Sequence, residues 1–341
     1  RDHCQNQWGP HSFGEPANPP QNHRWSLPED YHLNAWIAER TNARIDHAVA
    51  EQKPFFIWAS FFDPHPPYLV PAPWDTMYDP AKLTVPAATP GEFEKAPPHI
   101  QATQTPKPDF SAYQETPYTN HGLHCHLHDP EKLRKNIAVY YGMMSMMEKY
   151  IGRILDHLDA TGQAENTLVV FTTDHGHYYG HHGLIAKGPF HYEDGIKLPF
   201  IARWPGRIPA GAESDSLVSL IDLPVTFLHA AAAPVPPSMQ GVDLAPALAD
   251  PAAAVRDHAV CEHRHQPTAV HLKTLVTPTH KLTVYYNREY GELYDLVADP
   301  GEINNLWAEP SARELRESLT RKLLYAEMGA EPMPMPRVSV A

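Results

Sequence analysis

The chain has 341 residues and carries 27 Lys and Arg against 40 Asp and Glu, so its formal net charge at pH 7 is −13. This charge excludes nucleic acid as the main partner, because phosphate contacts require clustered Lys and Arg, and no apolar run is long enough for a membrane span. The cysteines, Cys4, Cys125 and Cys261, are too few and too far apart for a disulfide framework or a Cys-based zinc site.

The chain begins with a polar, proline-rich stretch over residues 1–28 that is typical of the interior of a loop. It shows no initiating methionine and no charged-then-apolar signal segment. We therefore expect a front portion of the protein to precede Arg1, and any export signal would lie in that portion.

The first half of the chain predicts helices and strands in alternation. Apolar residues at near-helical spacing predict a helix over 30–52, and the apolar run 55–60 predicts a strand buried on both faces of a parallel sheet. Residues 129–131, where Asp precedes Pro, indicate the start of a long helix that is expected to end near Gly162. A second buried strand is predicted at 168–171. This alternation favours an α/β fold with a mostly parallel central sheet flanked by helices.

The character of the sequence changes after a proline-containing linker that ends near residue 250. Short β-like runs and one final helix at 311–326 follow, which predicts a small antiparallel sheet with one helix. We therefore expect an N-terminally incomplete main α/β domain over 1–250 and a C-terminal α+β subdomain over 251–341. The β-like runs lie at 258–262, 270–277, 281–286 and 292–296.

Two apolar runs each end in an aspartate and a histidine, and a lysine follows the second pair. Asp63 and His65 come after the first run; Asp174 and His175 come after the second, with Lys187 a short loop later. In open α/β sheets, ligands bind beyond the carboxyl ends of the strands, so these groups would meet at one edge of a sheet. Carboxylate and imidazole are ligands for divalent cations, and an ammonium adds positive charge. The pattern therefore predicts a site for an anionic substrate held by a metal ion.

Each of these residues also has an ordinary structural explanation. Asp174 and His175 would then be a helix cap and a solvated histidine at a strand-to-loop turn. Lys187 would be a surface lysine, and His65 would be a loop histidine with a satisfied ring. For Asp63, a turn-forming role is favoured over a ligand role.

Several further histidines are candidates for weaker roles. His182 and His191 are candidate substrate contacts, and simple packing is the alternative for His182. A histidine cluster at 121–128 is interpreted as a solvated or cleft-lining loop rather than a transition-metal site. Together with the aromatic loop at 68–74, this cluster is a candidate wall of a sugar-binding cleft.

An ordered series of motifs resembles the sulfatase family of the alkaline-phosphatase superfamily. The strongest are TTDHG at 172–176, GHHGL at 180–184 and KGPF at 187–190, and DPH at 63–65 matches as well. Near the C-terminus, ELYDL at 292–296 and the run that follows it resemble the C-terminal sulfatase signature. The likeness spans nearly the whole chain, and it is more specific for the family than for one substrate.

The resemblance implies an alkaline-phosphatase-like sandwich and gives roles to the candidate residues. Asp174 and His175 would be metal ligands, Lys187 would contact the sulfate, and His65 would lie at the leaving-group oxygen. The divalent ion of the family is usually calcium (Ca²⁺), which suits oxygen ligands, and a histidine ligand leaves room for manganese (Mn²⁺). Bacterial sulfatases of this kind are commonly exported, so a periplasmic or secreted location is expected.

The sequence departs from the family in the residues that carry the nucleophile. Sulfatases have a Cys or Ser in a C/S-x-P/A-x-R motif, which is converted to formylglycine, and a pair of N-terminal aspartates on the first strand. Neither feature is present in the 341 residues. We therefore interpret the chain as a sulfatase without its front end, and we expect this segment alone to be inactive.

The resemblance leaves more than one function open. The favoured function is hydrolysis of a sulfate ester by a metal-assisted formylglycine mechanism, with a sulfated carbohydrate or small molecule as the partner. A phosphonate monoester or phosphodiester hydrolase of the same superfamily is the first alternative, because such enzymes can carry the same Asp-His metal pair. A non-catalytic homologue that binds sulfated glycans is the second alternative.

Overall fold

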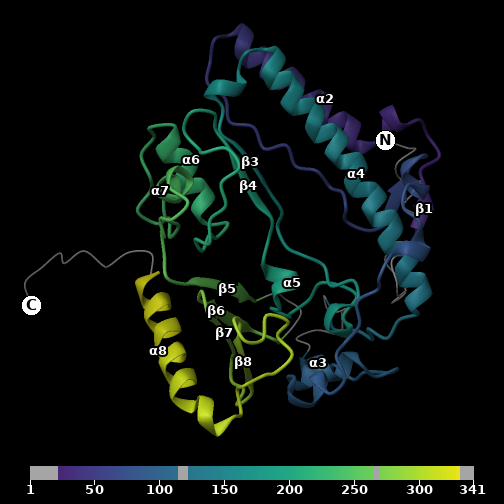
Figure 1. Ribbon diagram of the computed structural model, residues 1–341, viewed down its shortest axis with the longest axis vertical. Coiled ribbons are helices and arrows are strands. Elements are labelled where there is room, and N and C mark those ends of the chain that lie inside the picture. The colour runs from purple at the N-terminus through teal and green to yellow at the C-terminus, as the bar shows by residue number, and fades with distance from the viewer. Residues whose placement is uncertain (1–21, 114–121, 265–268, 331–341) are drawn as a thin grey trace, which may run out of the picture. The chain divides into compact units, whose positions relative to one another are not determined.

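The computed structural model describes residues 22–113, 122–264 and 269–330 (Figure 1). The chain forms two compact units, and each is assembled from segments that are distant in sequence. The predicted boundary at residue 250 lies inside the second unit, and the division into domains 1–250 and 251–341 stays a prediction. The first unit comprises Arg1–Ala87, His126–Thr167 and Tyr179–Ile185, and the second comprises Ala88–Cys125, Leu168–Tyr178 and Ala186–Ala341.

Two long helices, α2 (Leu33–Ala50) and α4 (Pro130–Ala160), lie side by side in the first unit (Figure 1). Asp129 caps α4 by accepting a hydrogen bond of 2.8 Å from a backbone N–H of the first turn. After the last turn, Gly162 has a φ of 69°, a left-handed conformation that glycine adopts without strain. Both predicted helices are therefore confirmed, because their caps and apolar faces were visible in the sequence.

The core of the first unit forms where α4 meets a short parallel pair of strands. Strand β1 (Asn22–Arg24) pairs with β2 (Tyr68–Val70), and β2 packs against α4. In the methionine-rich part of α4, Met143 is buried in this core and Met146 in a second cluster, whereas Met144 is 41% exposed. The buried residues of the main cluster are Tyr68, Val70, Leu133, Ile137, Met143, Tyr179 and Ile185, and those of a second cluster are Ala35, Ala38, Met146 and Tyr150.

The second unit contains two antiparallel sheets. Strand β3 (Val169–Thr172) pairs with β4 (Phe200–Arg203). A four-stranded sheet in the order β5-β6-β7-β8 follows, and α8 (Arg313–Gly329) packs its apolar face against it (Figure 1). This sheet and this helix confirm the predicted C-terminal antiparallel arrangement. The strands are β5 (Ala259–His263), β6 (Leu272–Val276), β7 (His280–Tyr285) and β8 (Gly291–Asp295).

Shorter helices punctuate the connections between these elements. None of the helices in the described part of the chain is long and apolar enough to cross a bilayer. The remaining α-helices are α3 (Pro98–Thr103), α5 (Glu193–Ile196), α6 (Asp222–Ala230) and α7 (Ala245–Ala249). The 3₁₀ turns are η2 (Glu29–Tyr31), η3 (Trp74–Thr76), η4 (Pro80–Lys82), η5 (Glu92–Lys95), η6 (Ser111–Tyr113), η7 (Ala164–Asn166), η8 (His181–Gly183) and η9 (Pro310–Ala312).

The predicted strand at 55–60 is wrong for the described structure. The apolar run within residues 53–62 is typical of a strand. These residues nevertheless form none, because none of the described strands pairs with them. Phe56 and Trp58 are 70% and 83% exposed, so the side chains expected inside a sheet face outward. Likewise, β3 pairs with β4 in the antiparallel sense rather than the predicted parallel one. An apolar run predicts burial. Whether it forms a strand depends on the strands that pair with it, and these lie elsewhere in the sequence.

Candidate functional site

The turn that follows β3 places Asp174 and His175 at the end of the strand. One Asp174 carboxylate oxygen, Oδ1, accepts hydrogen bonds from the His175 backbone N–H at 2.9 Å and from the Thr173 hydroxyl at 3.2 Å. Gly176 then donates its N–H to the carbonyl oxygen of Gly195 at 2.9 Å, so the turn is docked on α5. A Cβ at Gly176 would lie 1.8 Å from the Asp194 carbonyl oxygen, which is why glycine is required there.

Lys187 reaches the ring of His175 within the second unit. Its Nζ lies 2.9 Å from Nε2 of the ring, and the other ring nitrogen, Nδ1, lies 2.9 Å from the carbonyl oxygen of Gly176. A carbonyl oxygen can only accept, so this geometry assigns the ring proton to Nδ1 and the lone pair to Nε2. The ammonium of Lys187 therefore donates to a neutral imidazole.

The carboxylate of Asp174 completes this group. Its Oδ2 lies 3.4 Å from His175 Nε2, and the two side chains are 80% and 37% exposed. Burial alone would raise the pKa of Asp174, but the adjacent His175 ring and the hydrogen bonds from the His175 N–H and the Thr173 hydroxyl outweigh it and lower the pKa below its ordinary value. A charged carboxylate, an imidazole lone pair and an ammonium thus converge on one point, as expected from the sequence.

Asp174 and His175 suit a divalent cation as part of its ligand set. An ionised carboxylate oxygen and a neutral imidazole nitrogen face the same point, and both are donors that Ca²⁺ or Mn²⁺ accepts. In the described part of the chain, no three His, Cys, Asp or Glu side chains are grouped as a metal site would need. Asp174 and His175 supply two suitable donors, and their role as metal ligands stays a prediction.

His65 lies in the first unit, in a turn closed by a hydrogen bond of 3.1 Å from its own N–H to the carbonyl oxygen of Phe62. Its exposed ring packs against the Phe62 ring at a centroid distance of 4.9 Å, and its Nδ1 lies 2.6 Å from the carbonyl oxygen of Pro66. The ring is therefore oriented by its own loop, and its place at a leaving group stays a prediction.

Asp63 lies in the turn closed by the His65–Phe62 hydrogen bond, as the sequence favoured, and its side chain has a further partner. Its carboxylate is buried and accepts a hydrogen bond of 2.8 Å from the side-chain amide of Asn34 on α2. Burial raises the pKa of Asp63 to about 7, although the Asn34 hydrogen bond opposes the shift. The sequence did not predict that the Asp63 carboxyl group is buried, because its partner Asn34 lies on α2. The apolar run that precedes Asp63 was the one signal that could have indicated burial.

The two weaker histidine candidates are both buried. His182 lies in the first unit with a φ of 53°, a left-handed conformation that is uncommon for residues other than glycine. His191 lies in the second unit, where its Nδ1 is 2.8 Å from the hydroxyl of Thr274 on β6. Burial lowers the pKa of His191 to about 3, so its ring is neutral. Contact of either residue with a substrate stays a prediction.

The histidine cluster at 121–128 is only partly described, because residue 121 lies outside the described residues. His126 is fully buried, and its Nδ1 accepts a hydrogen bond of 3.1 Å from the backbone N–H of Ile185. His128 places its Nδ1 3.0 Å from the carbonyl oxygen of His126. These backbone contacts give the two rings a structural role.

Comparisons with known proteins identify the family of the chain. The family model described as Sulfatase matches residues 4–233, and the model described as N-sulphoglucosamine sulphohydrolase, C-terminal, matches residues 180–328. An N-acetylglucosamine-6-O-sulfatase of Bacteroides thetaiotaomicron is 31% identical over 199 residues, which are 56% of this chain and 36% of that protein. An arylsulfatase of Clostridium perfringens is 27% identical over 311 residues, 89% of this chain and 59% of that protein. The chain thus spans less than two thirds of the length of these relatives.

Solved structures show the same fold. A phosphonate monoester hydrolase from Silicibacter pomeroyi superposes with a TM-score of 0.77 and 24% identity, over 100% of this chain and 70% of that one. A second structure, described as a complex with its substrate D-glucosamine-2-N,6-O-disulfate, gives a TM-score of 0.66 and 22% identity, over 88% of this chain and 71% of that one. The α/β fold of the alkaline-phosphatase type is therefore shown, and the chain belongs to the sulfatase family of the alkaline-phosphatase superfamily.

Proposed function

We propose that the protein hydrolyses a sulfate ester and that this chain supplies the part of the site that grips the sulfate. One observation carries the proposal: Asp174, His175 and Lys187 converge at the end of β3 in a chain of the sulfatase family. An anion needs positive charge that is fixed before it arrives. Lys187 supplies one such charge, and a divalent cation on Asp174 and His175 supplies the other.

We propose a sulfated carbohydrate as the substrate class. Two neighbours support this choice, since one relative is named an N-acetylglucosamine-6-O-sulfatase and one structural neighbour is described with a disulfated glucosamine. A carbohydrate outside the cell would fit the periplasmic or secreted location expected from the family. A Drosophila relative named an extracellular sulfatase supports that location.

The residues of the chain have distinct tasks in this reaction. Lys187 donates its N–H groups to nonbridging sulfate oxygens, where negative charge gathers during displacement. A bound divalent cation would act as a Lewis acid toward the same oxygens. His175 would hold the cation through Nε2, the same atom that Lys187 now contacts at 2.9 Å, so the Lys187 ammonium would then be available to the sulfate. His65 donates a proton to the departing oxygen, and its exposed ring in the first unit is free to reach solvent.

The 341-residue sequence has no Cys or Ser in the modification motif that yields formylglycine. We therefore expect this chain alone not to turn over an aryl sulfate, and we expect the protein expressed from its complete reading frame to do so. The measurement is release of 4-nitrophenol from 4-nitrophenyl sulfate by both preparations. Turnover by the 341-residue chain alone would contradict this expectation.

A phosphonate monoester hydrolase is the second candidate, because a solved enzyme with that name superposes over 100% of this chain. The two functions are separated by comparing kcat/KM for 4-nitrophenyl sulfate and for a 4-nitrophenyl phosphonate monoester with the complete protein. A higher value for the sulfate supports the proposal, and a higher value for the phosphonate overturns it. Hydrolysis of neither, with retained binding of a sulfated oligosaccharide, would indicate the non-catalytic homologue.

A further inference from the structure

We propose that the C-terminal sheet positions Lys187, and that Glu302, Lys281 and Thr274 are the positioning residues through which it acts. The link is the segment 190–193, which follows Lys187 after two residues. The inference depends on the proposed function in one respect, namely that Lys187 contacts the sulfate. The physical coupling between the sheet and the lysine stands on geometry within the second unit.

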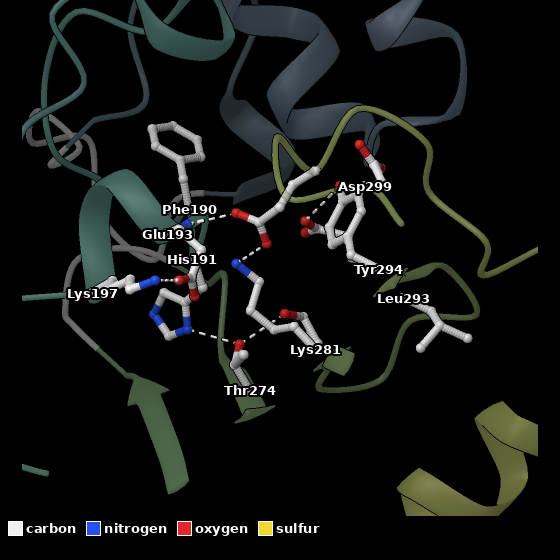
Figure 2. Close-up of polar contacts among 12 residues, drawn as sticks. Phe190, His191, Glu193, Lys197, Thr274, Lys281, Leu293, Tyr294 and Asp299 are labelled. Carbon is white, nitrogen blue, oxygen red and sulfur yellow. Dashed lines mark hydrogen bonds and ion pairs between the residues drawn. The ribbon is translucent and has the colours of Figure 1, made fainter. Parts of the chain in front are cut away.

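Successive residues of the segment 190–193 each have a defined partner in the second unit, and Figure 2 shows His191 beside Thr274. The Phe190 ring stacks on the buried ring of His99 with an interplanar angle of 7°, and His191 bonds to Thr274 on β6. Tyr192 packs against Tyr294 of β8 at a centroid distance of 6.0 Å. These contacts leave the segment no freedom to slide along the sheet.

Glu302 makes the contact that ends the segment. Its Oε2 accepts a hydrogen bond of 2.6 Å from the backbone N–H of Glu193, the first residue of α5. Its carboxylate also pairs with the ammonium of Lys281 on β7, and both side chains are 1% exposed. The Lys281 ammonium lies 6.0 Å from the Tyr192 ring centroid and 5.9 Å from that of Tyr294. A buried charge pair of this kind is held by its partners, so removing one partner is costly.

The loop that carries Glu302 is itself braced. The carboxylate of Asp299 accepts hydrogen bonds from the N–H groups of Ile303 and Asn304 at 3.1 and 2.7 Å. The side chain of Asn305 accepts from the Leu293 N–H on β8 and donates to the Gly291 carbonyl oxygen, both at 3.0 Å. Glu302 has a φ of 54° within this loop, a conformation that these bonds impose and that aims its carboxylate at α5.

The element that Glu302 holds touches both halves of the candidate site. On one side, the Gly195 carbonyl of α5 receives the Gly176 N–H from the turn that carries Asp174 and His175. On the other side, the segment 190–193 ends in the first residue of α5, and Lys187 precedes the segment by two intervening residues. A Cβ on Gly188 would lie 2.5 Å from the Phe190 ring, so the backbone beside Lys187 packs closely on the same segment. One carboxylate therefore sets the distance between the lysine and the metal ligands.

The test measures the exposure of the Lys187 ammonium rather than turnover. The 341-residue chain is treated with formaldehyde and a borohydride reductant, and the rate of dimethylation of Lys187 is followed by peptide mass spectrometry. A double variant, Lys281→Met with Glu302→Ala, removes the charge pair together and leaves the Glu193 N–H without its acceptor. The loss of one hydrogen bond changes the equilibrium between the held and released positions of Lys187 about fivefold. We therefore expect dimethylation of Lys187 to be about five times faster in this variant.

Two comparisons separate positioning from general loosening. Lys281→Met with Glu302→Gln keeps an acceptor for the Glu193 N–H, so the rate returns toward that of the unchanged chain. Asp222→Asn alters a fully buried carboxyl group whose partners are the N–H groups of Ser219 and Val242 and the guanidinium of Arg256, none of which belongs to the segment 190–193, so it leaves the rate unchanged. Equal rates in the two double variants, or a matching rise in Asp222→Asn, would overturn the proposal.

A milder variant keeps the test decisive if the double variant with alanine does not fold. Thr274→Val removes the hydroxyl bonded to His191 and keeps the side-chain shape, and we expect a rise of about twofold in the Lys187 rate. An unchanged rate in this variant contradicts the proposal. Aryl sulfate turnover by the complete protein is measured separately, so a change in labelling without any turnover would overturn the proposed function and leave the positioning role intact.

Discussion

At the scale of single residues, Lys187 is the group whose charge the proposed function needs most. Lys187→Met keeps much of the side-chain volume and removes the ammonium, so kcat/KM for 4-nitrophenyl sulfate should fall by about 10²–10³-fold in the complete protein. Lys197→Met is the matched control, since Lys197 is 78% exposed and pairs only loosely with Glu193 at 3.4 Å. A similar loss in both variants would show that the charge of Lys187 is not specifically required.

A second residue-scale prediction concerns the buried carboxyl group of Asp63. Its pKa is about 7 in the folded chain against an ordinary value of 3.8, so the folded state binds more protons than the unfolded state between these values. The free energy of unfolding should therefore decrease as the pH rises from 4 to 7, by up to about 4 kcal/mol. Asp63→Asn removes the titration, so its stability should depend less on pH over this range.

Chemical denaturation at pH 5 and pH 8 checks this sign. Relative to the unchanged chain, Asp63→Asn should be more stable at pH 8, where the native carboxylate is charged and buried, and similar or less stable at pH 5. Asp79→Asn is the control, because that aspartate caps a short 3₁₀ turn with a solvent-exposed hydrogen bond. A difference between Asp63→Asn and the unchanged chain that is constant with pH would contradict the assignment.

At the scale of elements, the sequence predicted what local chemistry determines. The Asp-Pro start of α4 and the glycine after its end lie within the sequence of the helix, so both ends were visible. The run 55–60 carried the same apolar signal as β3, yet only β3 has a described ladder partner, Phe200–Arg203, about thirty residues away. The candidate site shows the same contrast between local and distant determinants. The closeness of Asp174 and Lys187 was expected, because both follow the end of a predicted strand. The dependence of Lys187 on Glu302 was not, because it arises from a partner more than a hundred residues distant.

The turn after β3 gives the element-scale prediction. Gly176→Ala would place a methyl group 1.8 Å from the Asp194 carbonyl oxygen, so the turn must move away from α5. We expect a loss of about 1–3 kcal/mol in the free energy of unfolding, by analogy with overpacked interiors. Gly152→Ala is the control: it lies inside α4 with nothing within 4 Å of the added Cβ, and it should stabilise by about 0.5–1 kcal/mol. Urea titrations of both variants provide the measurement, and equal effects would contradict the close approach.

At the scale of the whole molecule, the net charge of −13 opposes an anionic substrate and attracts divalent cations without any specific site. A metal titration must therefore distinguish cation binding by Asp174 and His175 from diffuse attraction by the net charge. At 0.15 M salt the screening length is about 8 Å, which weakens diffuse attraction far more than direct ligation. Under that condition, Mn²⁺ should raise the Tm of the unchanged chain and should fail to raise that of Asp174→Asn with His175→Asn. An equal shift in both would assign the effect to diffuse binding.

The same balance of charge predicts that metal and sulfate bind cooperatively. A cation held by Asp174 and His175 would cancel local negative charge and would occupy the Nε2 atom that Lys187 now contacts, so both positive groups would be available to the anion. If Mn²⁺ strengthens the binding of inorganic sulfate by some factor, sulfate must strengthen Mn²⁺ binding by the same factor, and we expect about tenfold. Calorimetric titrations of each ligand with and without the other measure both factors. Sulfate affinity that is unchanged by Mn²⁺ would mean that the cation and Lys187 do not act on the same anion. That result would contradict the sulfate-binding site proposed at the end of β3.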